Sequence, residues 1–233
     1  MSCQRPDARR AAYECLATAL FVWATASSAY DQNVVLATAA ASGAMAAALS
    51  HSLGAAFNPV LTLARAATGR LTAPQAAVDV FAQLAGALAG AAVLRLGPGM
   101  GALGGNAVVS GVSWSDALLG EAVASFAVVL LVLHSEVPAA VYGASVFAGT
   151  VVLLPYSSAG MNPLRTLGPA VVSRTWGAGL WTLVVGPAVG GGLAAAATLL
   201  LQHRWTDDKA PAEPETLDRA WETYRAATGR EAI

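Results

Sequence analysis

The sequence predicts an all-α polytopic membrane protein with six transmembrane helices, two half-helices and inverted three-helix repeats. The 233 residues are 56% hydrophobic and only 12% charged, with a mean hydropathy of +0.56, which is more apolar than an ordinary soluble domain. Of the 13 basic and 14 acidic residues, four precede Ala11 and twelve follow Gln202. The pattern Asn-Pro-apolar-x-Thr-Leu also occurs twice. These features favour an apolar membrane domain built from two related halves.

Apolar runs define the order of the predicted elements. A helix needs ~20 apolar residues to cross a bilayer, and six runs approach that length. They predict spans at about 11–30, 33–53, 74–95, 115–135, 138–155 and 176–202. The corresponding domains are a leader at 1–10, a membrane domain at 11–202 with repeats at about 11–95 and 115–202, and a tail at 203–233.

The two Asn-Pro boxes lie between the second and third spans and between the fifth and sixth. Asn is a favoured N-cap and Pro a favoured first helical residue, so each box predicts the start of a helix. Each of these helices has about 10–12 residues, too few to cross a membrane alone. A helix that starts at membrane depth must be buried in protein or line a watery cavity. The residues of the boxes are Asn58, Pro59 and Val60, and Asn162, Pro163 and Leu164.

The two halves also correspond outside the boxes. With three spans in each repeat, the second half must insert upside down, which is the inverted arrangement of many transport proteins. Small residues four positions apart let helices approach closely, so we interpret the paired glycines as packing positions. The matched features are Glu14-x-x-x-Thr18 with Glu121-x-x-x-Ser125, and Gly86 and Gly90 with Gly186 and Gly190.

Glu14 and Glu121 are carboxylates inside apolar spans. Such groups are costly in a membrane and are candidates for function. One interpretation is a proton relay. The other, which we favour, is a structural brace in which each carboxylate accepts hydrogen bonds from the backbone of a half-helix loop.

The paired boxes resemble the Asn-Pro-Ala signature of the aquaporin, or major intrinsic protein, family, although Val60 and Leu164 replace the alanines. The second box continues into Arg-Thr-Leu-Gly-Pro-Ala much as that family's does. The resemblance implies a passive pore in which Asn58 and Asn162 face a common path. It also implies a homotetramer with one pore in each subunit, and the brace role for the two glutamates.

The resemblance places Arg165 at the family's narrow selectivity filter. Counting back from the two asparagines assigns Thr38, Thr150 and Ala159 to the other filter positions. All three are small where familiar water channels carry larger residues, which predicts a wider constriction unless Phe57, Phe147 or Tyr156 leans into it. We expect a channel for water, extending to small neutral solutes, that excludes protons and ions. The alternative is a facilitator of glycerol, peroxide or ammonia; Thr166 and Ala170 disfavour a typical glycerol facilitator.

Other functions receive less support. The net charge of −1 gives no basic surface for nucleic acid. His51, His134 and His203 show no metal-ligand spacing, and no catalytic motif occurs, so we expect neither an enzyme nor a metal or cofactor. A coupled secondary transporter remains an alternative, but titratable groups in the spans are few: besides Glu14 and Glu121 we consider only Asp79, near the start of a span. Positive charges near the span ends place both termini in the cytoplasm, with membrane lipid as partner; the identity of the membrane stays open.

Overall fold

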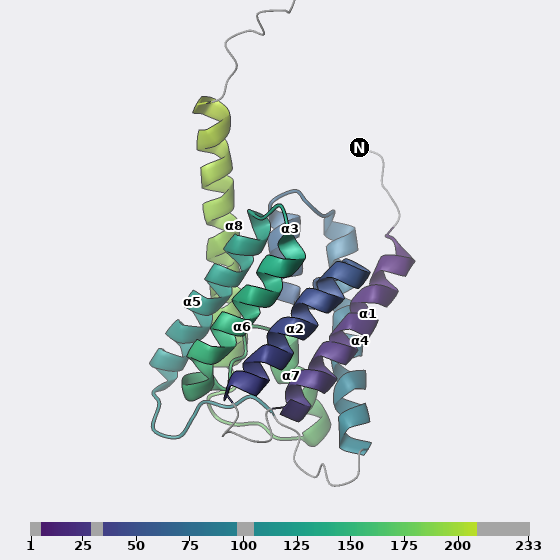
Figure 1. The fold of residues 1–233 in the computed structure, drawn as a ribbon, viewed down its shortest axis with the longest axis vertical. Helices are drawn as coiled ribbons and strands as arrows, with labels where there is room; N and C mark the ends of the chain where they lie inside the picture. The colour runs from purple at the N-terminus through teal and green to yellow at the C-terminus, as the bar shows by residue number, and fades with distance from the viewer. Residues whose placement is uncertain (1–5, 29–34, 97–104, 209–233) are drawn as a thin grey trace, which may run out of the picture. The chain divides into compact units, whose positions relative to one another are not determined.

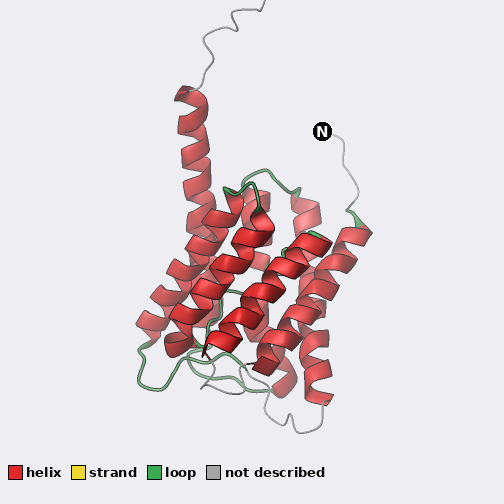
Figure 2. Ribbon diagram, viewed as in Figure 1, coloured by secondary structure: helices red, strands yellow, loops and turns green. Residues whose placement is uncertain are grey.

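The computed structural model describes residues 6–28, 35–96 and 105–208. The start of the leader, parts of two connections and the tail beyond Asp208 lie outside the described residues. All regular secondary structure in the described part is helical (Figure 2), so the predicted fold class is confirmed. The helices are α1 (Ala8–Ser28), α2 (Val35–Leu53), α3 (Pro59–Ala67), α4 (Ala73–Leu96), α5 (Trp114–Leu133), α6 (Pro138–Ser157), α7 (Pro163–Ser173) and α8 (Thr182–Asp208).

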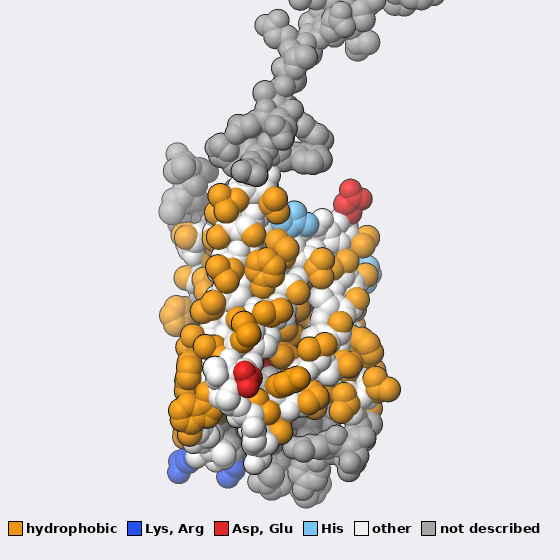
Figure 3. All heavy atoms as spheres, turned by 90° about the vertical axis from the view of Figure 1, so that its left-hand side faces the viewer, with side chains coloured by type: hydrophobic (Ala, Val, Ile, Leu, Met, Phe, Trp, Pro, Cys, Tyr) orange, Lys and Arg blue, Asp and Glu red, His pale blue; other side chains and the backbone are white. Residues whose placement is uncertain are grey.

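Six of these helices have 19 residues or more. At ~1.5 Å per residue they reach roughly the ~30 Å of a bilayer core. By length and composition, α4, α5, α6 and α8 are apolar enough to span a membrane. The other two long helices, α1 and α2, also carry polar side chains, including Glu14 on α1 and His51 on α2. Hydrophobic side chains cover most of the face in Figure 3, with Lys and Arg near its lower edge.

The two half-helices begin where the boxes predict and are short. Pro59 and Pro163 occupy their first turns, and they span 9 and 11 residues. The last long helix departs from the predicted span at 176–202, because α8 begins only at Thr182. Residues 177–182 form turns, with the Leu180 N–H bonded to the Gly177 carbonyl and the Thr182 N–H to the Gly179 carbonyl. Two glycines in this stretch disfavour a helix there.

Residues up to Thr198 form one compact unit, and the chain from Leu199 forms a second, of which the structure describes the end of α8. In the first unit α1 lies along α4, α2 lies along α6, and α5 packs against α6 (Figure 1). The half-helix α7 packs against α4, and α3 contacts α4, α5 and α7. The half-helices thus lie among the long helices.

Equivalent glycines hold the equivalent helix pairs together. A Cβ built on Gly86 would lie 2.1 Å from the Cys15 carbonyl oxygen, and one on Gly90 would lie 2.2 Å from that of Ala19. In the second half, a Cβ on Gly190 would lie 2.0 Å from the Ala122 carbonyl oxygen. The α1–α4 and α5–α8 contacts are therefore so close that no larger residue fits at these positions.

We expect Gly190→Ala to destabilise the protein, whereas Gly192→Ala, in the interior of the same helix, should not. The first substitution places a methyl group against the backbone of α5, which is already in contact with Gly190, and this lowers the free energy of unfolding by about 1–3 kcal/mol. The second places the same group where no atom lies within 4 Å. Thermal unfolding in detergent would measure both. Equal shifts in the two variants would contradict close packing at Gly190.

Candidate functional site

Asn58 and Asn162 cap the two half-helices in the same way. Their backbones are extended, with φ −145° and ψ 116° at Asn58 and φ −145° and ψ 109° at Asn162. Each side-chain Oδ1 accepts a hydrogen bond of 3.0 Å from the backbone N–H two residues later, at Val60 and at Leu164. This capping leaves the Nδ2 groups free to point away from the helix.

The two half-helices meet through these Nδ2 groups. Asn58 Nδ2 donates to the Met161 carbonyl at 2.9 Å, and Asn162 Nδ2 donates to the Phe57 carbonyl at 2.7 Å. Each asparagine thus donates to the residue that precedes the other asparagine. Because an amide NH₂ group has two hydrogens, this contact uses one hydrogen of each asparagine and leaves a second. Both side chains are almost fully buried.

A buried carboxylate holds each loop that leads into a half-helix. Glu14 on α1 accepts from the backbone N–H groups of Ala56 and Phe57, both at 2.8 Å. Glu121 on α5 accepts from those of Gly160 at 2.7 Å and Met161 at 2.6 Å. These loops need the support because Phe57 and Met161 have positive φ angles of 39° and 49°, which are costly for residues with a side chain.

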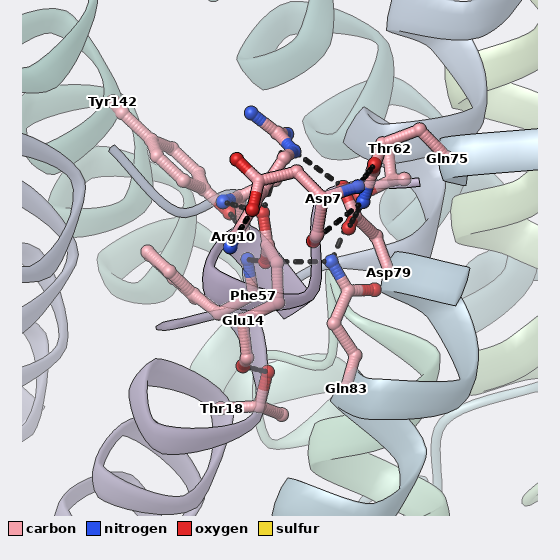
Figure 4. Close-up of polar contacts among 11 residues, drawn as sticks. Asp7, Arg10, Glu14, Thr18, Phe57, Thr62, Gln75, Asp79, Gln83 and Tyr142 are labelled. Atoms are coloured by element: carbon pink, nitrogen blue, oxygen red, sulfur yellow. Dashed lines mark hydrogen bonds and ion pairs between the residues drawn. The ribbon is translucent and has the colours of Figure 1, made fainter. Parts of the chain in front are cut away.

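The Glu14 carboxylate also belongs to a larger polar network (Figure 4). Gln83 on α4 donates through Nε2 to Glu14 at 2.9 Å and to Thr62 on α3 at 2.8 Å. Arg10 lies 3.5 Å from Glu14 and forms a 2.7 Å ion pair with Asp79, which is fully buried. Charges buried in this way are stable only when paired and hydrogen-bonded. The network connects α1, α3 and α4 around the first loop.

A small cavity adjoins both asparagines and Arg165. Its volume is about 20 Å³, enough for roughly one water molecule, since a cavity needs at least ~10–15 Å³ to hold one. Polar groups from both half-helices and apolar side chains from the long helices surround it. The lining residues are Phe21, Ser42, Asn58, Val128, Tyr142, Val146, Thr150, Ala159, Gly160, Met161, Asn162 and Arg165.

Arg165 lies at the junction of this cavity with a second one of about 290 Å³, which Thr38 also lines. Its side chain is 4% exposed. Nη2 donates to the Thr25 carbonyl at 3.3 Å, and Nη1 has no hydrogen-bond partner in the described part of the chain. Arg165 is therefore hydrogen-bonded through Nη2, while Nη1 is a buried donor that no described group uses. The structure thus places Thr150, Ala159 and Arg165 on the small cavity and Thr38 on the wider one.

The profile of the family described as "Major intrinsic protein" matches residues 2–198. The chain belongs to this family. Aquaporin-5 of Mus musculus is 32% identical over 240 residues, covering 91% of this chain and 89% of the relative. Aquaporin TIP3-2 of Zea mays is 36% identical over 223 residues, covering 81% of each. As a member of the family, the chain is a multi-pass integral membrane protein and a channel for water or small solutes.

A solved relative supports the fold of this major intrinsic protein. The aquaglyceroporin of Plasmodium falciparum matches with a TM-score of 0.66, covering 88% of this chain and 96% of that one. Its sequence identity is 18%, so the likeness concerns the arrangement of the helices. The predicted aquaporin-like fold is therefore confirmed by an independent structure.

Several residues at the site of this family member were not predicted from its sequence. Gln83 follows Asp79 by four residues, so the two side chains lie on one face of a helix. Two polar residues on one face of an apolar span are a signal that could have predicted a role for α4 in the site. Phe21 and Tyr142 give no such signal, because single aromatic residues in apolar spans are ordinary. Phe57, Phe147 and Tyr156, the aromatic residues that the sequence suggested for the constriction, do not line the small cavity. Phe57 is a buried residue of the loop itself, and Phe147 and Tyr156 are 38% and 47% exposed.

Proposed function

We propose that this major intrinsic protein is a passive water channel in which Asn58 and Asn162 orient each passing molecule. The observation that carries the proposal is the meeting of the two helix starts beside a cavity of about 20 Å³. A water molecule there gives its oxygen to the second hydrogen of each asparagine amide. With both lone pairs engaged, it cannot accept a proton from a neighbouring water.

We propose that the same arrangement excludes protons and cations. A helix N-terminus carries roughly half a positive charge, and α3 and α7 direct two such ends at one point. Arg165 adds a full charge, and its buried Nη1 has no hydrogen-bond partner in the described part of the chain. Positive helix ends and an arginine in a narrow path act as electrostatic barriers.

The identity of the solute depends on the filter. Thr38, Thr150 and Ala159 are small, which favours the alternative of a glycerol, peroxide or ammonia facilitator. The volume of about 20 Å³ beside the asparagines favours water, because glycerol has six heavy atoms where water has one. Water is therefore the solute that fits the described geometry.

A coupled transporter would need carboxylates that can exchange protons or bind cations. Glu14, Glu121 and Asp79 instead all accept hydrogen bonds: Glu14 and Glu121 from backbone N–H groups and side chains, and Asp79 from Arg10 and Gln75. These hydrogen bonds favour the interpretation of Glu14 and Glu121 as structural braces over that of a proton relay. The absence of a free carboxylate among these three disfavours ion coupling.

We further propose a homotetramer in membrane lipid, with one pore in each subunit and both termini in the cytoplasm. The positive-inside rule supports this orientation. The cationic residues that it places inside are Arg5, Arg9, Arg10, Arg65, Arg70, Arg204 and Lys209, against Arg95, Arg165 and Arg174 outside. We retain 11–202 as the channel domain, with 1–10 as leader and 203–233 as tail.

Purified protein in liposomes tests the proposal. We expect stopped-flow light scattering to record fast shrinkage in an impermeant osmolyte and slow re-swelling in a glycerol gradient. Removal of the charge in Arg165→Ala should raise cation leakage, while Arg174→Ala, which removes an arginine at the far end of α7, should not. Shrinkage no faster than that of empty liposomes would refute the water channel, and flux that follows an imposed proton or sodium gradient would favour the transporter.

A further inference from the structure

Tyr142 is a buried tyrosine that the proposed mechanism does not use. It lies on α6, is 1% exposed, and its side chain lines the small cavity. Its hydroxyl donates to the Ala56 carbonyl at 3.0 Å. Ala56 belongs to the loop that Glu14 holds, two residues before Asn58. Tyr142 thus joins α6 directly to the first half-helix loop.

An aromatic cluster fixes the position of this side chain. The rings of Tyr142 and Phe57 stack with their centroids 5.0 Å apart and an interplanar angle of 16°. Phe21 on α1 also packs against Phe57, with the ring centroids 4.9 Å apart. Rotation of Tyr142 would break the stack and leave a buried carbonyl without its donor, which is unfavourable. The ring is therefore a rigid part of the cavity wall.

The helix that carries Tyr142 is also held tightly. A Cβ on the next residue, Gly143, would lie 2.7 Å from the Gly43 carbonyl oxygen and 2.6 Å from the Ala47 Cβ. The backbones of α2 and α6 are therefore in close contact at this level. The wall formed by Tyr142 cannot move outward without separating these two helices.

Tyr142 is far from the filter position on the same helix. It precedes Thr150 by eight residues, which is about 12 Å along an α-helix at ~1.5 Å per residue. Thr150 and Arg165 both line the small cavity, whereas the Tyr142 hydroxyl contacts the loop before Asn58. The lining of the cavity thus combines an arginine and its small neighbours with two aromatic rings, Phe21 and Tyr142.

We propose that Tyr142, together with Phe21, forms a second size filter and is a specificity-determining residue of this channel. This inference rests on the proposed function. Thr150 and Ala159 are small, and the bulky side chains that the long helices place on the same cavity are those of Phe21 and Tyr142, so we assign exclusion by size to this aromatic pair. Water passes beside the rings, and polyols of the size of glycerol do not.

The test compares water and glycerol permeability of liposomes that contain the full chain. We expect Tyr142→Leu to raise glycerol permeability about tenfold or more, the range that small steric changes in a pocket produce. Tyr142→Phe keeps the ring and should still exclude glycerol. Phe21→Leu removes the second ring of the cavity wall and should raise glycerol permeability as Tyr142→Leu does. If Tyr142→Leu does not fold, the glycerol permeability of Phe21→Leu tests the proposal. Phe147→Leu is the matched control, because Phe147 lies on the same helix and is 38% exposed.

The outcomes separate the two proposals. If the wild-type protein conducts neither water nor glycerol, the inference falls together with the proposed function. Rapid glycerol flux through the wild type would overturn the second filter and leave the channel standing. The second filter is equally overturned if water alone passes and neither leucine variant admits glycerol, or if Tyr142→Phe admits as much glycerol as Tyr142→Leu.

Discussion

Glu121→Gln is expected to abolish water conduction and to destabilise the protein. The Glu121 carboxylate accepts from the Gly160 and Met161 N–H groups with its two oxygens. Glutamine has one acceptor oxygen, and its NH₂ group would face a backbone donor. An orphaned buried N–H costs about 1–3 kcal/mol, and more where a charged partner is lost. We therefore expect the loop to leave its positive-φ conformation and to carry Asn162 out of place.

Stopped-flow shrinkage and thermal unfolding would measure these two effects. Glu136→Gln is the matched control, because Glu136 is exposed beside the start of α6, and it should change neither quantity. Wild-type water permeability in Glu121→Gln would show that the carboxylate does not hold the second half-helix. A flux that follows a proton gradient in the wild type and is lost in Glu121→Gln would instead indicate a proton relay, the interpretation that we did not favour.

Asn162→Asp is expected to admit protons and cations while the fold survives. Aspartate is as good an N-cap as asparagine, so α7 should still begin at Pro163, although the hydrogen bond from Nδ2 to the Phe57 carbonyl is lost. The new charge opposes the roughly +0.5 that each helix start contributes, which leaves the centre of the path without a positive barrier. At an effective dielectric of 20, a unit charge ~4 Å from a cation contributes about 4 kcal/mol. Hydration and screening reduce this value, and we expect at least a tenfold rise in leakage, about 1.4 kcal/mol.

Proton flux into liposomes that contain a pH-sensitive dye would measure the leak. Thr175→Asp adds the same charge at an exposed position before α8 and should leave proton flux at the wild-type level. Asn58→Asp should leak like Asn162→Asp, because the two asparagines occupy equivalent positions. If either central variant remained proton-tight, the helix starts would not form the barrier.

The sequence pattern was sufficient to predict both half-helices and both carboxylates. Asn-Pro marks a helix start through local preferences alone, and a glutamate in an apolar span is noticeable because it is so costly. The start of α8 was placed too early, because the apolar run between Trp176 and Thr182 continues into the span although it contains two glycines. The filter assignments of Thr38, Thr150, Ala159 and Arg165 remain predictions of function.

The contacts among distant residues could not be predicted in this way. The Asn58–Met161 and Asn162–Phe57 hydrogen bonds join positions 103 and 105 residues apart. Arg10 and Asp79 are separated by 69 residues, and nothing in either neighbourhood identifies the other as its partner. The role of Tyr142 also depends on a carbonyl 86 residues away.

The sequence by itself determined the helices, the two repeats and the residue types at the centre, because hydrophobic length, capping preferences and the cost of buried charge act locally. Only the tertiary structure decided which groups face one another. It placed one hydrogen of each asparagine amide on the opposite loop, and it set two aromatic rings on the wall of the small cavity. The physical reason is that a pore is defined by the distances between its walls, and those distances depend on how α1, α2, α5 and α6 pack around the half-helices.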